Sequence, residues 1–130
     1  MVTVHISPQS IGKVMISVLK TDGSVQLARQ IDFVGKSGTL YRYSVHDLSR
    51  AVPTAGANYV IAATTKTVAS VLFVGETENL ASRDWQRHLD RAQSQDRDAE
   101  LLIRLNVRSA VRKLECEDMI AAYTPALNAA

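Results

Sequence analysis

The chain has 130 residues, of which 46% are hydrophobic and 22% charged, and its formal net charge is +2 at neutral pH. This composition is that of a globular protein, and the length suits a single domain with a buried core. No apolar run approaches the ~20 residues of a membrane span and no secretory signal opens the chain, so we expect no membrane partner.

The first part of the chain reads as strands separated by turns. Period-two alternation and many β-branched and aromatic residues predict strands at 2–6, 13–19, 25–33, 39–45, 58–64 and 68–75. Asp22-Gly23 is a strong hairpin signal between the second and the third of these strands. Glycines bound another reversal at 35–38, and a loop containing Pro53 precedes residue 58.

Beyond Gly75 the spacing of apolar residues becomes helical, which predicts a helix that includes Leu80, Trp85, His88 and Leu89. A polar loop is expected at 92–98 and one more strand at 100–107.

Ser109 is expected to cap a final helix at 110–123, which Pro125 ends. The buried face of this helix is predicted to comprise Val111, Leu114, Met119 and Ile120. The order of elements predicts an α+β domain with helices packed on a mostly antiparallel sheet. We expect one domain over residues 1–130, with an N-terminal β extension at about 1–37 and a core at about 38–128.

Several common chemistries have no pattern in this sequence. Three histidines and one cysteine, Cys116, are too widely spaced for a zinc site, and neither a nucleotide-binding glycine loop nor a nucleophile elbow is present. The lone cysteine excludes an internal disulfide, which fits a reducing, cytoplasmic compartment. The chain beyond Gly75 carries eight basic residues, namely Arg83, Arg87, Arg91, Arg97, Arg104, Arg108, Arg112 and Lys113. They form either a solvated helix surface or a positive face that meets phosphates.

Two separated stretches resemble the GIY-YIG nuclease family, which is named for a Gly-Ile-Tyr tripeptide on one strand and Tyr-Ile-Gly on the next. Ala57-Asn58-Tyr59 and Phe73-Val74-Gly75 stand at these positions, and GETENLASR continues the second motif up to Arg83. RKLECEDMIAAYTPALN, at 112–128, is similar to the family's closing pattern. GTLYRYSVHDL, at 38–48, resembles a lead-in strand of some members, so the resemblance spans roughly residues 38–128.

The resemblance implies hydrolysis of DNA phosphodiester bonds with one divalent ion, Mg²⁺ or Mn²⁺. It implies that Tyr59 orients or activates the nucleophile and that Arg83 contacts the scissile phosphate through its planar donor fork. His88 would assist proton movement. For two of these residues a plainer interpretation stays open: Tyr59 as an amphipathic strand tyrosine and His88 as a helix-surface histidine.

The resemblance also implies that Gly75 and Asn79 shape the motif and that Asn128 helps to hold the site together. The metal ligand would be Glu115, with Glu117 as the alternative. The family's glutamate falls at or next to Cys116, and the two flanking glutamates lie about 200° apart on a helix, so only one of them can face the site.

One departure bears on activity, because Phe73 replaces the second signature tyrosine and removes a hydroxyl. Unless Tyr41 or Tyr43 supplies another, the loss of one placed donor costs ~2.7–4 kcal/mol of transition-state stabilisation. Three hypotheses follow: a metal-dependent DNA endonuclease, a catalytically degenerate nucleic-acid-binding or interaction module, and a β-rich adaptor. The N-terminal strands could extend the sheet, contact DNA or pair two chains as a homodimer.

Overall fold

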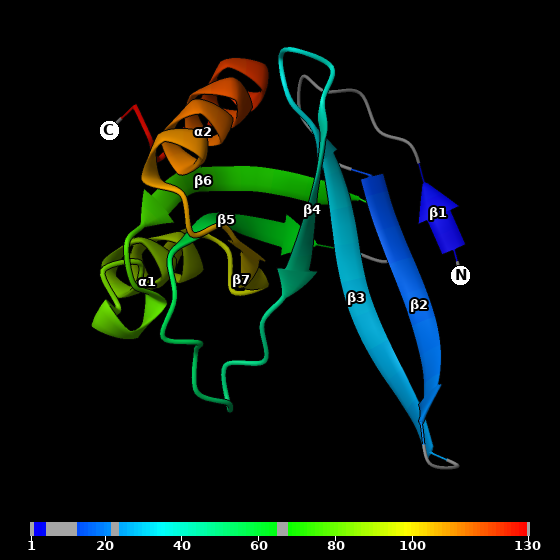
Figure 1. Ribbon diagram of the computed structural model, residues 1–130. Coiled ribbons are helices and arrows are strands. Elements are labelled where there is room, and N and C mark those ends of the chain that lie inside the picture. The colour runs from blue at the N-terminus through cyan, green and yellow to red at the C-terminus, as the bar shows by residue number, and fades with distance from the viewer. Residues whose placement is uncertain (1, 5–12, 22–23, 65–67, 130) are drawn as a thin grey trace.

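The structure is a computed structural model that describes residues 2–4, 13–21, 24–64 and 68–129, with side chains from Arg29 onward. Its strands are β1 (Val2–Val4), β2 (Lys13–Thr21), β3 (Ser24–Val34), β4 (Leu40–Val45), β5 (Ala57–Thr64), β6 (Ala69–Thr77) and β7 (Ala99–Leu105). A short 3₁₀ helix, η1 (Leu80–Ser82), precedes the helices α1 (Gln86–Gln95) and α2 (Ser109–Tyr123) (Figure 1).

In the described part of the chain, seven strands form one sheet in the order β1-β2-β3-β4-β7-β5-β6, and neighbouring strands run antiparallel. The α+β class predicted from the sequence is therefore confirmed. The β2–β3 hairpin extends away from the two helices (Figure 1). Its predicted turn at Asp22-Gly23 lies outside the described residues.

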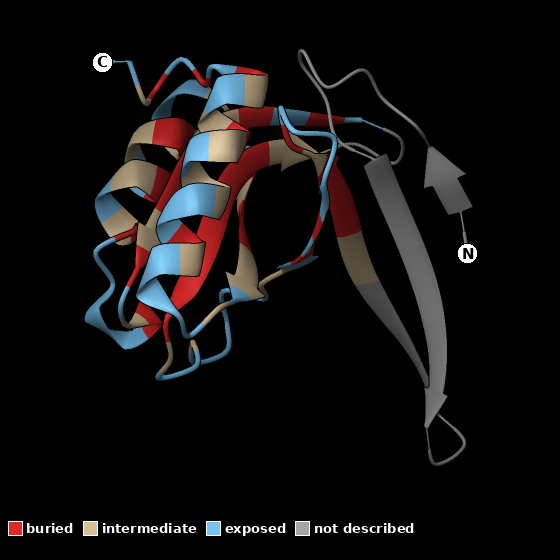
Figure 2. Cartoon of the chain, turned by 45° about the horizontal axis from the view of Figure 1, so that its top comes forward, coloured by how far each residue is buried: buried red, intermediate tan, exposed pale blue. Residues whose placement is uncertain are grey.

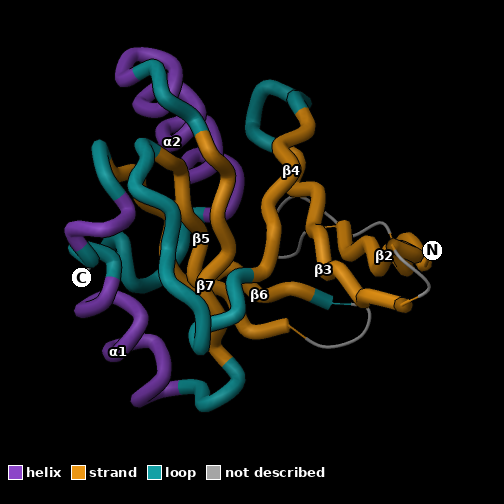
Figure 3. Tube along the Cα trace, turned by 60° about the horizontal axis from the view of Figure 1, so that its bottom comes forward, coloured by secondary structure: helices purple, strands orange, loops and turns teal. Residues whose placement is uncertain are grey.

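The two helices pack on opposite faces of the sheet. Successive side chains of β5 point to opposite faces, and alternate residues of this strand contact different helices. Tyr59 and Ile61 join a core cluster with Leu89 of α1. Val60 joins the other cluster with Met119 of α2. Figure 3 shows α1 and α2 on either side of β5 and β7, and Figure 2 shows the buried strand residues that the helices cover.

A bulge in β6 decides which β6 side chains share the α1 face. Ile61 pairs with Phe73 and Ala62 pairs with Val71, so Leu72 is the extra residue on β6. Both Leu72 and Phe73 consequently pack against the α1-side cluster.

Three local predictions for the helices were wrong. Residues 92–95 belong to α1 and are not a loop, and α1 begins only at Gln86, after the separate turn η1. Ser109 is the first residue of α2 and does not cap it. The N-cap position is taken by Arg108, whose side chain makes no capping hydrogen bond.

The predicted buried face of α2 was also partly wrong, since Leu114 is 67% exposed. The buried residues of α2 are Arg112, Met119 and Tyr123, whose spacing of seven and four follows the helical repeat. Leu114 lies about 200° around the helix from Arg112, on the solvent side. The predicted end of α2 is confirmed: Thr124 adopts a left-handed conformation (φ 40°) just before Pro125.

Candidate functional site

Tyr59 and Gly75 form the centre of the motif region. They are directly paired across β5 and β6, and Tyr59 is 4% exposed. A Cβ atom at position 75 would lie 2.5 Å from Cζ of Tyr59 and 2.6 Å from its hydroxyl oxygen. Gly75 is thus required because the tyrosine ring lies directly over it.

Phe73 and His88 extend this centre into an aromatic stack. The ring centroids of Phe73 and Tyr59 are 6.0 Å apart, with an angle of 22° between the ring planes. The ring centroids of Phe73 and His88 are 4.0 Å apart, with an angle of 14° between the planes. Burial lowers the pKa of His88 below its usual value, and the positive charges of Arg87 and Arg91 lower it further. The negative charge of Asp84 opposes this lowering of the pKa but has a smaller effect than either arginine. His88 therefore lies on the outer side of the stack, where positive charge outweighs negative charge.

The phenol of Tyr59 is a proton donor at neutral pH. Burial raises the pKa of Tyr59 above its usual value, and the negative charge of Asp84 raises it further, while Arg87 opposes the shift. A protonated phenol can donate a hydrogen bond to a phosphate oxygen. It is not a ready general base.

Asn79 and Arg83 shape the turn that leads into α1. The Asn79 side chain accepts a hydrogen bond from Ala81 N at 3.0 Å and so caps η1. Arg83 follows this turn in a left-handed conformation (φ 57°), and its guanidinium donates to Oε1 of Gln86 at 2.6 Å. Its Cζ lies 5.2 Å from the centre of the Trp85 ring.

Arg83 and His88 lie on different flanks of α1. Gln86, which holds the Arg83 side chain, is about 200° around the helix from His88. Leu89, between these flanks, is buried against the sheet. The structure therefore brings Tyr59 and His88 together through Phe73 but does not bring Arg83 to them.

Asn128 binds the backbone of β6 beside the motif. Its Oδ1 accepts from Val74 N at 2.9 Å and its Nδ2 donates to Val74 O at 2.8 Å. Leu127 N also donates to Leu72 O at 3.2 Å. The closing asparagine thus fastens the segment after α2 along the strand that carries Phe73 and Gly75.

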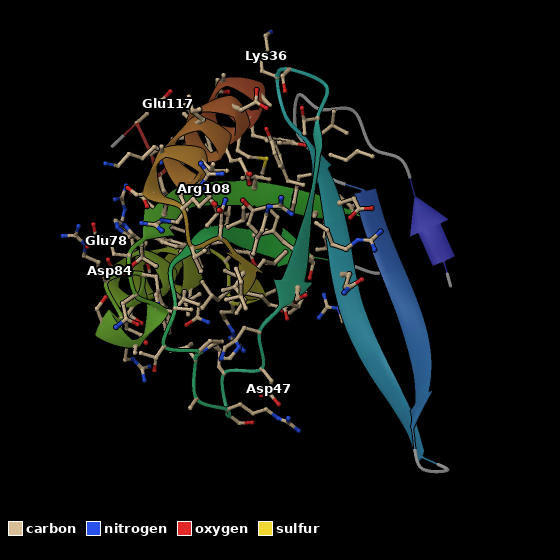
Figure 4. All side chains as sticks on the ribbon, in the orientation of Figure 1. Lys36, Asp47, Glu78, Asp84, Arg108 and Glu117 are labelled. Atoms are coloured by element: carbon tan, nitrogen blue, oxygen red, sulfur yellow. The ribbon has the colours of Figure 1, made fainter. Side chains whose placement is uncertain are left out.

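Glu115 lies on the other face of the sheet from Tyr59. It accepts a hydrogen bond from Nε of Arg104 at 2.8 Å, and the Arg104 guanidinium lies over the ring of Tyr41 in the α2-side layer. Glu117 is exposed on α2, away from Asp84 beside α1 (Figure 4). Among the described residues, no three His, Cys, Asp or Glu side chains come close enough to hold a metal ion. The residues present do not fit a magnesium or manganese ion held by Glu115 beside Tyr59.

Neither neighbouring tyrosine replaces the hydroxyl missing at Phe73. Tyr41 and Tyr43 belong to the cluster on the α2 side, whereas Phe73 packs on the α1 side. The Tyr41 hydroxyl is bound to Asp118 at 2.6 Å. The Tyr43 hydroxyl is buried with no hydrogen-bond partner among the described residues.

A buried polar network at the start of α2 was missed by the sequence reading. Arg112 is 3% exposed, and it donates to Glu76 at 2.9 Å and to the backbone oxygens of Asn106 and Val107 at 3.1 Å. Asn58 in turn donates to the backbone oxygen of Arg112 at 2.9 Å. In the sequence, Arg112 precedes Met119 by seven residues and Tyr123 by eleven, a helical spacing that places Arg112 on the buried face of α2. This spacing is the signal that could have identified the buried arginine.

Comparison of the chain with models of protein families, with curated proteins and with solved structures finds no match in any of the three. None of the described helices is both long and apolar enough to cross a membrane. The resemblance to GIY-YIG nucleases accordingly rests on the motif residues alone.

Proposed function

We propose that this chain is a nucleic-acid-binding domain on a GIY-YIG-like scaffold, which holds DNA phosphates on the His88 flank of α1. The observation that carries this proposal is the position of Arg87 and Arg91, one helical turn apart and close enough to His88 to lower its pKa. Neither arginine is in an ion pair with a described residue. Arg91 Nη2 makes one long contact, 3.5 Å, with the backbone oxygen of Leu127. The other N–H groups of Arg91 and the guanidinium of the exposed Arg87 can make charge-assisted hydrogen bonds to phosphate oxygens.

The aromatic stack gives this flank a second means of contact. His88 lies on the outer side of Phe73, and both side chains are only partly buried. A flat ring beside two arginines suits a nucleic acid, because bases and sugars pack on aromatic faces while the cations hold the backbone.

The metal-dependent DNA endonuclease predicted from the sequence is the second candidate. The observation that favours it is the contact of Tyr59, Phe73 and His88 beside the same cations, where the protonated Tyr59 hydroxyl could donate to a phosphate. The pairing of Glu115 with Arg104 counts against it. Binding without turnover is therefore the function that the geometry supports best.

Fluorescence anisotropy with a labelled DNA duplex, in salt from about 50 to 200 mM, tests the first candidate. Affinity should fall as salt rises, and the double variant Arg87→Ala/Arg91→Ala should flatten the log–log salt slope by about two units. Arg108→Ala, an exposed arginine before α2, is the matched control and should change the slope little. An unchanged slope in the double variant would contradict the proposed interface.

Nicking of supercoiled plasmid separates the two candidates. The binding domain should leave the plasmid intact with or without Mg²⁺ or Mn²⁺. Nicking that needs the ion and disappears in both Arg83→Ala and Glu115→Gln would establish the endonuclease instead. Circular dichroism of both variants would show that the fold survives.

A further inference from the structure

A pocket lies on the other flank of α1, between this helix and the loop that follows β4. It encloses about 150 Å³. The side chains that line it are His46, Leu48, Arg50, Val52, Arg83, Trp85, Gln86, Leu89 and Gln93. The loop side of the pocket lies near Asp47, far from Arg108 and Glu117 in Figure 4.

The polar lining of this pocket consists of cationic, imidazole and amide groups, without a carboxylate. Arg50 makes one long ion-pair contact, 3.8 Å to Asp47, in which the two side chains are 80% and 62% exposed. Such an exposed pair contributes little and leaves the guanidinium available. Arg83 is bound to the neutral amide of Gln86, so its charge is not compensated there. His46 is held beside these groups by a 3.2 Å contact with Arg50 O.

The floor of the pocket is apolar. Trp85 and Leu89 are each 1% exposed, and the Trp85 indole N–H already donates to Leu80 O at 2.9 Å. The floor therefore offers no further hydrogen bond, and the accessible apolar surface of the pocket comes from Leu48, which is 49% exposed, and the half-buried Val52. A ligand that fits would carry its charge toward the arginines and an uncharged part against Leu48 and Val52.

We propose that this pocket binds the terminal phosphate monoester of a DNA strand, an inference that rests on the proposed DNA-binding function. Its volume is below the ~300–1,000 Å³ of sites that take a whole drug-sized ligand, which suits a phosphate with part of its sugar. A phosphate inside an unbroken backbone would have to bring both neighbouring nucleotides into the same space.

The charge of the pocket favours the same ligand. A phosphate monoester carries a charge of about −1.5 to −2 at neutral pH, whereas a diester carries a single negative charge. Two guanidinium forks, Arg50 and Arg83, can each bind two oxygens of one phosphate. The arrangement places DNA end recognition on one flank of α1 and backbone binding on the other.

The test compares one single-stranded oligonucleotide in three forms: 5′-phosphorylated, 3′-phosphorylated and with hydroxyls at both ends. Anisotropy should show that one phosphorylated form binds about tenfold more tightly than the hydroxyl form, the effect of one charge-assisted hydrogen bond. Trp85 is the single tryptophan of the chain, so its fluorescence should change with the preferred form and not with the hydroxyl form.

Arg50→Gln should remove the preference while the hydroxyl form binds as before, because Arg50 is exposed and its loss leaves the core intact. Arg108→Gln should keep the preference. Equal binding of all three forms would overturn this inference and leave the proposed DNA-binding function standing. Binding of none of them would overturn this inference, and the duplex titration would then decide the proposed DNA-binding function separately. A preference that survives in both Arg50→Gln and Arg83→Gln would place the end-binding site elsewhere and overturn the inference.

Discussion

The ring of Tyr59 occupies the space where a side chain at position 75 would begin, 2.5 Å from Cζ to the place of the absent Cβ. The two residues are partners across β5 and β6. The glycine of the second motif is therefore explained by the tyrosine of the first.

Gly75→Ala should destabilise the fold by about 1–3 kcal/mol, because the new methyl group would push the Tyr59 ring into its neighbours. Urea unfolding followed by circular dichroism measures this. Ser70→Ala, at an exposed position of the same strand, is the control and should change the free energy of unfolding by less than about 0.5 kcal/mol. Equal stability of the two variants would mean that the ring can move aside without cost.

Arg112→Met should destabilise the protein by about 3–5 kcal/mol, because the carboxylate of Glu76 and two carbonyl oxygens would lose their buried donor. Lys113→Met changes the adjacent, exposed residue and should have little effect. Differential scanning calorimetry of the pair checks this. A similar midpoint for both variants would show that the network does not hold α2 to the strands.

Tyr43→Phe and Tyr41→Phe should shift stability in opposite directions. The first removes a buried hydroxyl that has no partner among the described residues, so the free energy of unfolding should rise by about 1 kcal/mol. The second removes a 2.6 Å hydrogen bond to Asp118 and should lower it by about 1 kcal/mol. Urea midpoints of the two variants decide this, and a loss of stability in Tyr43→Phe would contradict it.

His88 should titrate below its usual pKa of 6.5, because its burial and the charges of Arg87 and Arg91 disfavour the imidazolium. The unfolded chain then binds the proton more readily than the folded one. The neutral His88 therefore contributes to the free energy of unfolding. This contribution is fully present above pH 6.5, the pKa of the unfolded chain, and is lost as the pH falls through the lower pKa of the folded chain.

NMR titration of the imidazole protons measures this pKa directly. Arg87→Ala and Arg91→Ala should each raise the pKa of His88 toward 6.5. Arg97→Ala, an exposed arginine beyond the end of α1, should leave it unchanged. If the pKa of His88 is unchanged in all three variants, burial alone lowers it.

The sequence predicts the class of the fold well because strand alternation and helix periodicity are local. The strand beginning near residue 58 and the helix ending before Pro125 appear within a residue of their observed bounds. The entry into α1 could not be predicted in this way. There the capping bond of Asn79 and the left-handed Arg83 set the start of the helix, and neither has a hydrophobic period.

The candidate site was predictable only in part, because strand order decides which residues meet. Pairing of β5 with β6 brings Tyr59, Phe73 and Gly75 together, and these positions follow from the two motifs. Glu115 comes from α2, whose orientation is set by the packing of its Met119 in the cluster that contains Val60 of β5, so the separation of Glu115 from Tyr59 depends on tertiary structure. The burial of Arg112 is equally a tertiary effect, since arginine is seldom buried unless paired.

The amide of Asn128 has a consequence for self-association. β6 is the edge strand at one end of the described sheet. Its outward-facing backbone groups, the N–H and C=O of Val74 and the C=O of Leu72, are hydrogen-bonded to Asn128 and to Leu127 N. An intruding strand would have to displace this segment before it could add to the sheet, which guards the motif strand against edge-to-edge polymerisation. Among the described strands, β1 forms the opposite edge, so a homodimer that joined two sheets end to end would form there.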